Sequence, residues 1–229
     1  MGLADLHIHT VYSYDGTASV PDVLSRAKEV GLDVIAITDH DEIMGALKAF
    51  DMAPQFGIEV IPGIEITTAE GDLLALFVTQ KIKPGRWLIE TILDVGEAGG
   101  ICIAPHPMAR GAAMKSLSAH SIRRALDHPV AGRVLVGIET YNATLLDRES
   151  NLHAQKLWAE NPGIAQVGSS DAHILQAIGS GATEFLGNTA AHLLDALWVG
   201  ATDVHQGEPI SSVQLLGNWA LDFIKNRIP

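Results

Sequence analysis

Several histidines and acidic residues occur in short clusters that could bind divalent metal ions. The first cluster, Asp5-Leu6-His7-Ile8-His9, ends an apolar segment that begins at Leu3. Alternate residues of a β-strand share a face, so His7 and His9 would point the same way and could hold one ion between them. A lone His-x-His pattern fits equally well with one histidine bonded to a backbone carbonyl and the other exposed.

Further metal-competent side chains follow other apolar segments of the chain. These clusters are Thr38-Asp39-His40-Asp41, Pro62-Gly63-Ile64-Glu65, Ala104-Pro105-His106-Pro107, Ile138-Glu139-Thr140-Tyr141-Asn142 and Ser169-Ser170-Asp171-Ala172-His173. In an α/β barrel the C-terminal ends of the strands meet at one rim, where active sites are built. Nitrogen and oxygen ligands without thiolates suit Zn²⁺, Mn²⁺ or Fe²⁺ in a multinuclear hydrolytic site. The other five of the ten histidines, at positions 120, 128, 153, 192 and 205, are expected to be structural or solvated.

Strand-like apolar segments alternate with segments of helical periodicity. The expected strands are residues 3–9, 33–38, 59–62, 64–67, 73–78, 101–104, 134–140 and 164–169, and the expected helices are residues 20–30, 44–50, 87–98, 118–126, 148–160, 190–199 and 215–228. Residues 70–72 predict a turn, which is compatible with a hairpin. The alternation indicates βα units and a parallel sheet, although periodicity alone does not separate a barrel from an open sheet.

Composition narrows the class of protein. The chain has 229 residues, 47% of them hydrophobic and 18% charged, which is typical of a globular chain. A formal net charge of −12 disfavours a long nucleic acid as a partner but leaves room for a small phosphorylated substrate. The single cysteine, Cys102, lies in an apolar segment and is expected to be buried. We expect one cytoplasmic domain over residues 1–229, with no signal peptide and no membrane partner. Oligomer formation stays open.

The clusters together resemble a known family. Asp-Leu-His-Ile-His-Thr at 5–10, Tyr-Ser-Tyr-Asp-Gly at 12–16, Ile-Thr-Asp-His-Asp at 37–41, Pro-Gly-Ile-Glu at 62–65, His-Pro at 106–107 and Ser-Asp-Ala-His at 170–173 resemble, in order, the motifs of the PHP (polymerase and histidinol phosphatase) domain family. The motifs fall within residues 3–187, and a C-terminal helical extension is expected over residues 188–229. The resemblance implies a distorted (β/α)7 TIM-like barrel, of class α/β, with two or three divalent ions.

The resemblance also implies the ligands of each ion. The first ion would be held by His7, His9, Glu65 and Asp171, the second by Glu65 and His106, and the third by Asp15, His40 and His173. Many small phosphoesterases of the family carry a histidine where this chain has Asp72, in Gly71-Asp72-Leu73-Leu74. Asp72 could replace that histidine as an oxygen ligand of the second ion, or it could be an ordinary turn residue that leaves this ion weakly bound.

The activity implied is that of a metal-dependent phosphoesterase. It would hydrolyse a phosphomonoester or phosphodiester of a small molecule, a nucleotide or a short oligonucleotide, using a metal-activated hydroxide. Asp15 or His173 could pass a proton to the leaving group. Arg110 is the first candidate for binding the substrate phosphate, and Arg148 and Asn142 are weaker candidates.

Two acidic residues are expected to support the site. Asp39, next to His40, could orient a ligand histidine, or it could cap a helix N-terminus. Glu139 could be a further ligand, but a role in supporting the barrel fits its place within an apolar segment better.

Two other functions stay open. An amidohydrolase also begins with His-x-His and ends with a late aspartate, but that class generally uses a lysine or glutamate in mid-barrel and two later histidines on separate strands. A non-catalytic, metal-binding PHP module would be expected to lack ligands, and here only Asp72 is in question. A panel of phosphoesters, amides and lactones distinguishes the first alternative, and metal content without turnover would indicate the second.

Overall fold

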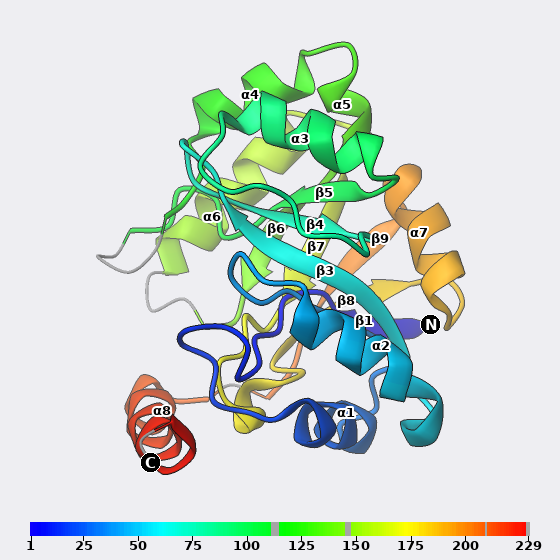
Figure 1. Cartoon of the computed structure of the whole chain (residues 1–229). Helices are drawn as coiled ribbons and strands as arrows, with labels where there is room; N and C mark the ends of the chain where they lie inside the picture. The colour runs from blue at the N-terminus through cyan, green and yellow to red at the C-terminus, as the bar shows by residue number, and fades with distance from the viewer. Residues whose placement is uncertain (111–114, 145–147, 209, 228–229) are drawn as a thin grey trace.

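The computed structural model describes residues 1–110, 115–144, 148–208 and 210–227. In these residues nine strands form one sheet in the order β7-β6-β5-β4-β3-β2-β1-β8-β9. They are β1 (Gly2–Asp5), β2 (Val34–Ile37), β3 (Glu59–Thr67), β4 (Asp72–Leu76), β5 (Ile101–Ala104), β6 (Leu135–Asn142), β7 (Ala165–Ser169), β8 (Gly181–Phe185) and β9 (Thr202–Gln206). The sheet curves into a nearly closed barrel, which confirms the predicted α/β barrel class (Figure 1).

The barrel combines parallel and antiparallel strands. Strands β1, β2 and β3 pair in parallel, as do β5, β6 and β7, whereas β4 is antiparallel to both of its neighbours. The β3–β4 pair is the hairpin that the turn at residues 70–72 made possible. Beyond their strands, the ends of β1 and β7 also meet: His9 N donates to Ala172 O at 2.9 Å, and Ala172 N donates to His7 O at 3.2 Å. The segments with the first and last candidate ligands are therefore adjacent.

Seven of the described helices correspond to predicted ones, whereas the short helix α5 (Ala131–Val134) was not predicted. The described helices are α1 (Val20–Glu29), α2 (Met44–Phe56), α3 (Leu88–Glu97), α4 (Ala119–Leu126), α5 (Ala131–Val134), α6 (Arg148–Ala159), α7 (Ala190–Trp198) and α8 (Ser212–Arg227), with a short 3-10 helix at Leu175–Ala177. Helix α2 extends past Pro54, although it was expected to end near residue 50. The proline removes one backbone hydrogen bond, but the buried face continues through Ala53, and Gly57 ends the helix in the left-handed conformation.

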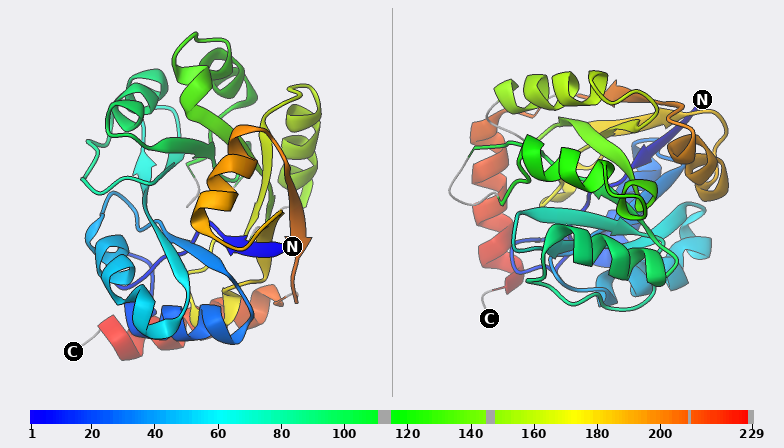
Figure 2. Two further views of the ribbon diagram at one scale, coloured as in Figure 1. Left: turned by 90° about the vertical axis from the view of Figure 1, so that its right-hand side faces the viewer. Right: turned by 90° about the horizontal axis from the view of Figure 1, so that it is seen from above.

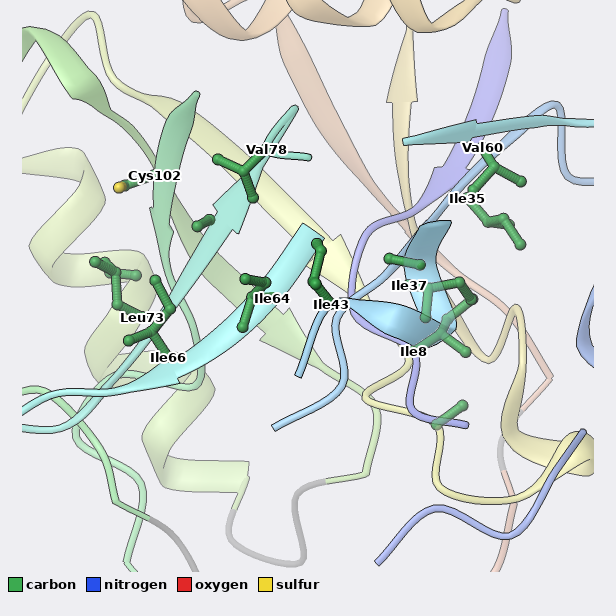
Figure 3. Packing of buried hydrophobic residues seen from close by; sticks show 14 of the residues in the cluster. Ile8, Ile35, Ile37, Ile43, Val60, Ile64, Ile66, Leu73, Val78 and Cys102 are labelled. Atoms are coloured by element: carbon green, nitrogen blue, oxygen red, sulfur yellow. The ribbon is translucent and has the colours of Figure 1, made fainter. Parts of the chain in front are cut away.

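The strands are buried on both faces, and each face contributes to a different part of the core. In β2, Ile35 and Ile37 belong to the larger hydrophobic cluster, which includes the outer helices (Figure 3). The alternating residues, such as Val34, belong to a second cluster that also contains Leu193 and Leu197 of α7. Figure 2 shows α7 lying across the barrel. Because these contacts involve the starting ends of strands, the opposite ends remain available for a site.

Strands β8 and β9 were not predicted. The sequence of β8, Gly-Ala-Thr-Glu-Phe, contains few residues that favour strands, and β9 lies in the segment expected to be a helical extension. Pairing stabilises them instead: β8 is antiparallel to β1, and β9 is antiparallel to β8. The side chain of Phe185 is fully buried, so tertiary packing outweighs the weak local preference.

Two further expectations concern single features of the chain. Cys102 lies in β5 and is buried, and burial raises the pKa of its thiol, in keeping with the structural role expected for it. Among the described residues, no helix is both long enough and apolar enough to cross a membrane.

Candidate metal centre

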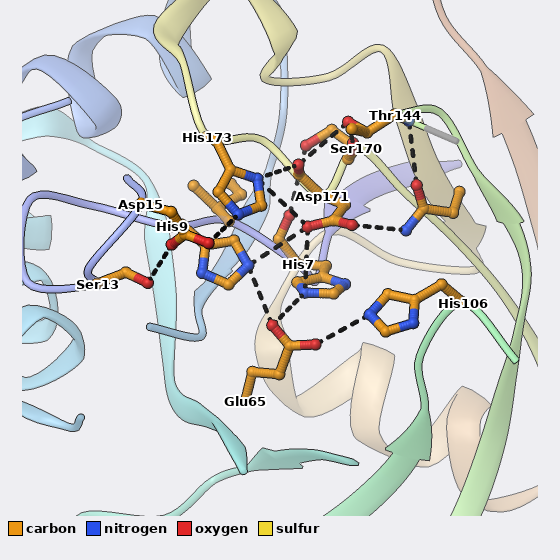
Figure 4. Close-up of polar contacts among 12 residues, drawn as sticks. His7, His9, Ser13, Asp15, Glu65, His106, Thr144, Ser170, Asp171 and His173 are labelled. Carbon is orange, nitrogen blue, oxygen red and sulfur yellow. Dashed lines mark hydrogen bonds and ion pairs between the residues drawn. The ribbon is translucent and has the colours of Figure 1, made fainter. Parts of the chain in front are cut away.

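Four imidazoles approach the carboxylate of Glu65, and Figure 4 shows three of them, those of His7, His9 and His106. Glu65 lies in β3 and its side chain is buried. Its Oε2 atom is 3.1 Å from His7 Nε2, 3.2 Å from His9 Nε2 and 3.3 Å from His40 Nδ1. Its Oε1 atom is 3.0 Å from His106 Nε2. The ends of β1, β2 and β5 therefore direct their histidines at one carboxylate of β3.

Two aspartates extend the cluster. Asp171 Oδ1 is 3.4 Å from His7 Nε2 and 3.3 Å from His9 Nε2, and Asp15 Oδ2 is 3.2 Å from His173 Nε2. The donor atoms form four groups, each with all its atoms within 4.8 Å of one another: His7, His9 and Asp171; His7, Glu65 and His106; His9, Asp15, His40 and His173; and His40, Glu65 and Asp72. The structure thus brings together all nine residues that the sequence suggested as metal ligands.

Contacts of Nδ1 in two histidines determine which ring nitrogen could coordinate an ion. His173 Nδ1 is 3.0 Å from the backbone oxygen of Asp171, which can only accept, so Nδ1 carries the hydrogen. His7 Nδ1 is likewise 3.2 Å from Glu139 Oε1. In both rings Nε2 is the nitrogen that faces the carboxylates of the cluster, and it would be the coordinating atom once an ion displaced its hydrogen.

Buried polar atoms without partners indicate that this donor set fits a cation. Both ring nitrogens of His9 and the Oδ1 atom of Asp72 are buried and make no hydrogen bond in the described structure. His9 Nε2 is near two carboxylate oxygens, yet its geometry is not that of a hydrogen bond. Buried polar atoms are costly when unpaired, and a divalent ion between them would satisfy nitrogen and oxygen donors together.

Electrostatics keeps the central carboxylates ionised. Burial alone would raise the pKa of Glu65, but the positive charge on His7 and His40 holds this pKa well below its usual range. Burial also opposes ionisation of Asp171, and His7 and His9 outweigh it, so its pKa is lowered as well. Asp15 follows the same pattern, with hydrogen bonds from neighbouring imidazoles lowering its pKa against burial. These anionic groups are the ligands that a divalent cation requires.

Asp72 behaves in the opposite way. Burial raises its pKa to about 6, and the nearby charge of Glu65 raises it further. The charges of His106 and His40 lower this pKa, but they do not outweigh burial and Glu65. The resemblance placed Asp72 on the ion shared by Glu65 and His106, whereas in the structure its donor atom groups with His40 and Glu65.

The backbone at two candidate ligands is strained. His106 has φ 27° and Asp171 has φ 52°, and such left-handed conformations are uncommon for residues other than glycine. Strain of this kind is retained where the surrounding structure holds a functional side chain in place. The turns at the ends of β5 and β7 therefore direct these two side chains into the cluster at a conformational cost.

Glu139 and Asn142 form hydrogen bonds to the candidate ligands and support their positions. The Oε2 atom of Glu139 accepts from His106 N at 2.5 Å, and its Oε1 atom accepts from Ser169 Oγ as well as facing His7. Asn142 Nδ2 donates to Glu139 Oε2 at 2.9 Å and to Asp171 Oδ2 at 3.0 Å. Both carboxylate oxygens of Glu139 thus support other residues of the site, which is the role that its place within an apolar segment favoured. Asn142 was expected to bind substrate. This expectation is corrected, because its amide is buried and engaged by two carboxylates.

Two other aspartates position the strand ends. Asp39 accepts from Thr10 N at 2.6 Å and from Thr10 Oγ1 at 2.8 Å. It therefore fixes the loop after His9 rather than an imidazole, and the N-cap of α2 is Ile43. Asp5, which was not predicted, accepts from the backbone amides of Ser170 and Gly179, both at 3.0 Å. Its position two residues before His7 was the available signal.

Three residues near the surface complete the survey of the predicted site. Arg110 is exposed. Arg148 begins α6, but its side chain lies outside the described part of the structure. Tyr14, which was not predicted, stacks on His40 with ring centroids 4.9 Å apart and planes at 20°. Its position next to Asp15 in the sequence was the available signal that Tyr14 lies at the site.

Comparisons with known proteins agree with this geometry. Residues 5–170 match the PHP domain family, and residues 148–202 match a family described as PHP-associated. The uncharacterized protein MJ1587 of Methanocaldococcus jannaschii is 38% identical over 150 residues, which are 61% of this chain and 81% of that protein. A 5'-3' exoribonuclease of Haemophilus influenzae is 44% identical over 64 residues, which are 28% of this chain and 23% of that protein.

Solved structures share the fold. A two-domain protein from Bacteroides vulgatus, described as containing a predicted PHP-like metal-dependent phosphoesterase, has a TM-score of 0.72 at 19% identity, covering 96% of this chain and 69% of that one. An amidohydrolase from Chromobacterium violaceum has a TM-score of 0.61 at 18% identity, covering 89% and 97%. At these identities the likeness concerns the fold alone.

The fold and the cluster define an α/β barrel protein with a candidate multinuclear metal centre at the strand ends. The PHP domain match spans most of the chain and contains seven of the nine candidate ligands, and the PHP-associated match contains the other two, Asp171 and His173. The chain belongs to the PHP domain family.

Replacing Asp72 by Asn should weaken the binding of one divalent ion by about tenfold or more, because an ionised oxygen ligand is lost. Without metal, the same variant should unfold at a higher temperature than the unchanged protein at pH 7. The pKa of Asp72 is raised from 3.8 to about 6 in the fold, so the folded state loses stability as the pH rises between these two values and the full loss persists at pH 7. Asn removes this effect.

Metal titration and thermal unfolding with and without Mn²⁺ measure both effects. Asp51→Asn, at an exposed position of α2, is the matched control. Equal metal affinity and equal unfolding temperatures for Asp72→Asn and the control would contradict a ligand role.

Proposed function

We propose that this chain is a metal-dependent phosphoesterase that hydrolyses a phosphomonoester or phosphodiester of a small molecule, a nucleotide or a short oligonucleotide. The observation that carries the proposal is the carboxylate of Glu65, which faces His7, His9, His40 and His106 within 3.3 Å. A single carboxylate facing imidazoles from three separate strand ends is the arrangement of a bridging metal ligand. Two or three ions of Zn, Mn or Fe suit this nitrogen and oxygen donor set.

Divalent ions bound here would lower the pKa of a coordinated water towards neutrality and neutralise charge on the phosphoryl oxygens. The protein residues then have distinct tasks. The carboxylate of Glu139 accepts from Nδ1 of His7, and the backbone oxygen of Asp171 accepts from Nδ1 of His173. These contacts orient both rings so that Nε2 faces the cluster. Asp15 Oδ2 and His173 Nε2 lie 3.2 Å apart at a half-buried edge of the cluster. Because the pKa of Asp15 is lowered and that of His173 is raised, a protonated His173 is the member of the pair that could pass a proton to the leaving oxygen.

Metal analysis combined with a substrate panel tests the proposal. The protein as purified and after Mn²⁺ loading should hydrolyse at least one generic phosphomonoester or phosphodiester, a chelator should abolish turnover, and added metal should restore it. His7→Ala should fold normally but lose bound metal and activity. An absence of turnover on all phosphoesters, with metal content unchanged in His7→Ala, would contradict the proposal.

The same panel distinguishes the other candidate functions. Faster turnover of amides or lactones than of phosphoesters would favour an amidohydrolase. Full metal occupancy without turnover on nucleotides, sugar phosphates or short oligonucleotides would favour a non-catalytic metal-binding module.

A further inference from the structure

A cavity of about 490 Å³ lies between helix α8 and the candidate metal centre. Its walls include the candidate ligands Asp15 and His173 and, from α8, Leu215, Leu216, Trp219 and Phe223. Asp15 and His173 also belong to the donor group of His9 and His40. The cavity is therefore contiguous with the cluster.

Helix α8 is fixed to the loop that carries one of these ligands. Trp219 Nε1 donates to the backbone oxygen of Asp15 at 2.8 Å. The rings of Trp219 and Phe223 lie 5.0 Å apart, and Leu215 and Trp219 pack against the main hydrophobic cluster. Figure 1 shows α8 beside the loop between β1 and α1, apart from the other helices. The helix thus forms one wall of the cavity in a defined position.

The chemistry of the walls is mainly apolar. Tyr14 and Ile174 face the cavity opposite α8. The hydroxyl of Thr144 already contacts two acceptors, Ser170 O at 2.6 Å and Asp171 O at 3.1 Å. The indole N–H of Trp219 is also engaged. Apart from Asp15 and His173, the walls present ring faces and aliphatic carbons to a bound molecule. They present few hydrogen-bond donors that are not already engaged.

A flat apolar ligand group matches these walls best. Tyr14 is 64% exposed and Leu216 is 58% exposed, so a ligand here would remove apolar surface from water. Aromatic rings such as those of Trp219 and Phe223 stack or pack edge to face with another ring. A sugar or a charged group would lose hydrogen bonds to water without replacement.

We propose that the cavity between α8 and the cluster binds the organic group of the phosphoester, and that this group is an apolar aromatic ring. This proposal rests on the proposed function, because the phosphoryl group would be held at the cluster next to Asp15 and His173. Helix α8 would then determine specificity, whereas the strand ends would supply the chemistry.

Binding of non-hydrolysable phosphonates tests the proposal independently of turnover. Titration calorimetry on the metal-loaded protein would compare methylphosphonate with 2-naphthylmethylphosphonate, which share one head group. The naphthyl ring should tighten binding by about tenfold or more, given the apolar area that it buries. An adenosine phosphonate should gain less, because the polar edge of its base finds few partners. An equal or larger gain for adenosine would contradict the apolar assignment.

Variants of α8 locate the effect. Phe223→Ala should remove most of the gain from the naphthyl ring while leaving the affinity for methylphosphonate and the metal content unchanged. Trp219→Phe keeps a ring but loses the hydrogen bond to Asp15, and it should retain more of the gain than Trp219→Ala. Leu221→Ala is the matched control, because Leu221 lies on the same helix, is exposed and is outside the cavity.

The outcomes separate this proposal from the proposed function. If methylphosphonate binds and simple phosphoesters are hydrolysed but the naphthyl ring adds no affinity, the aromatic subsite is wrong and the phosphoesterase stands. If neither phosphonate binds to the metal-loaded protein and no phosphoester is hydrolysed, both are wrong. A gain that persists in Phe223→Ala and Trp219→Ala would also overturn the assignment to α8.

Discussion

Replacing Glu65 by Gln should lower phosphoesterase turnover by about a thousandfold and reduce the number of bound divalent ions by at least one. The substitution keeps the size of the side chain but removes the negative charge that faces four imidazoles. Metal ions contribute several kcal/mol to transition-state stabilisation, which corresponds to a factor of about a thousand. Steady-state kinetics and elemental analysis of the same samples measure both effects.

A control separates loss of the site from loss of charge. Glu97→Gln removes one negative charge from the exposed end of α3 and should leave turnover and metal content unchanged. Circular dichroism should show that both variants are folded. Turnover within about threefold of the unchanged protein in Glu65→Gln, with full metal content, would exclude a bridging role for Glu65.

Replacing Glu139 by Gln should weaken metal binding by about ten- to a hundredfold without direct loss of a ligand. The glutamine retains the shape of the side chain, but one of the two oxygens that face His7 Nδ1 and His106 N becomes an amide donor. The ligand that faces the new amide would then lose its fixed orientation. A titration of metal-free protein with Mn²⁺ measures the affinity.

Rescue by metal identifies Glu139 as a positioning residue. Excess Mn²⁺ should restore most of the activity of Glu139→Gln, whereas Glu65→Gln should stay largely inactive at the same concentration. Glu184→Gln in β8 is a suitable control for a charge change on a strand. Unchanged metal affinity in Glu139→Gln would show that the contacts to His7 and His106 have no effect on the centre.

The candidate ligands could be predicted because their signals are local. His7 and His9 were expected to share a face through the two-residue period of a strand, and the other histidines, Glu65 and Asp171 follow or end apolar segments, whereas Asp15 and Asp72 were suggested only by the resemblance to the family. In a barrel with parallel strands, the common rim then brings these segments together. The convergence on Glu65 follows from the fold class, so the sequence was sufficient for the composition of the cluster.

The supporting contacts could not be predicted in the same way. Asn142 seemed a candidate for substrate binding, but its amide bonds Glu139 and Asp171, which is 29 residues away in the chain. Asp5 bonds amides more than 160 residues away. Whether such a polar side chain faces the substrate or another ligand depends on tertiary packing, which has no signature in the sequence.

In the C-terminal segment, the sequence predicted a helix but neither the role of that helix nor the neighbouring strands. The apolar spacing of Leu215, Trp219 and Phe223 predicted a helix, and α8 confirms it. A helical stripe of this kind usually enters the core, whereas here it forms a wall beside the cluster. Strands β8 and β9 were missed because their stability comes from pairing with β1 and with each other rather than from local preference.

Anomalous diffraction from crystals of the Mn²⁺-loaded protein tests the central claim most directly, because it locates each ion relative to its ligands. We expect two or three anomalous peaks within the cluster, with one of them contacting both Glu65 and His106 and another contacting Asp15, His40 and His173. A peak that also contacts Asp72 would establish its ligand role. Fully loaded crystals without any anomalous peak near Glu65 would contradict the account.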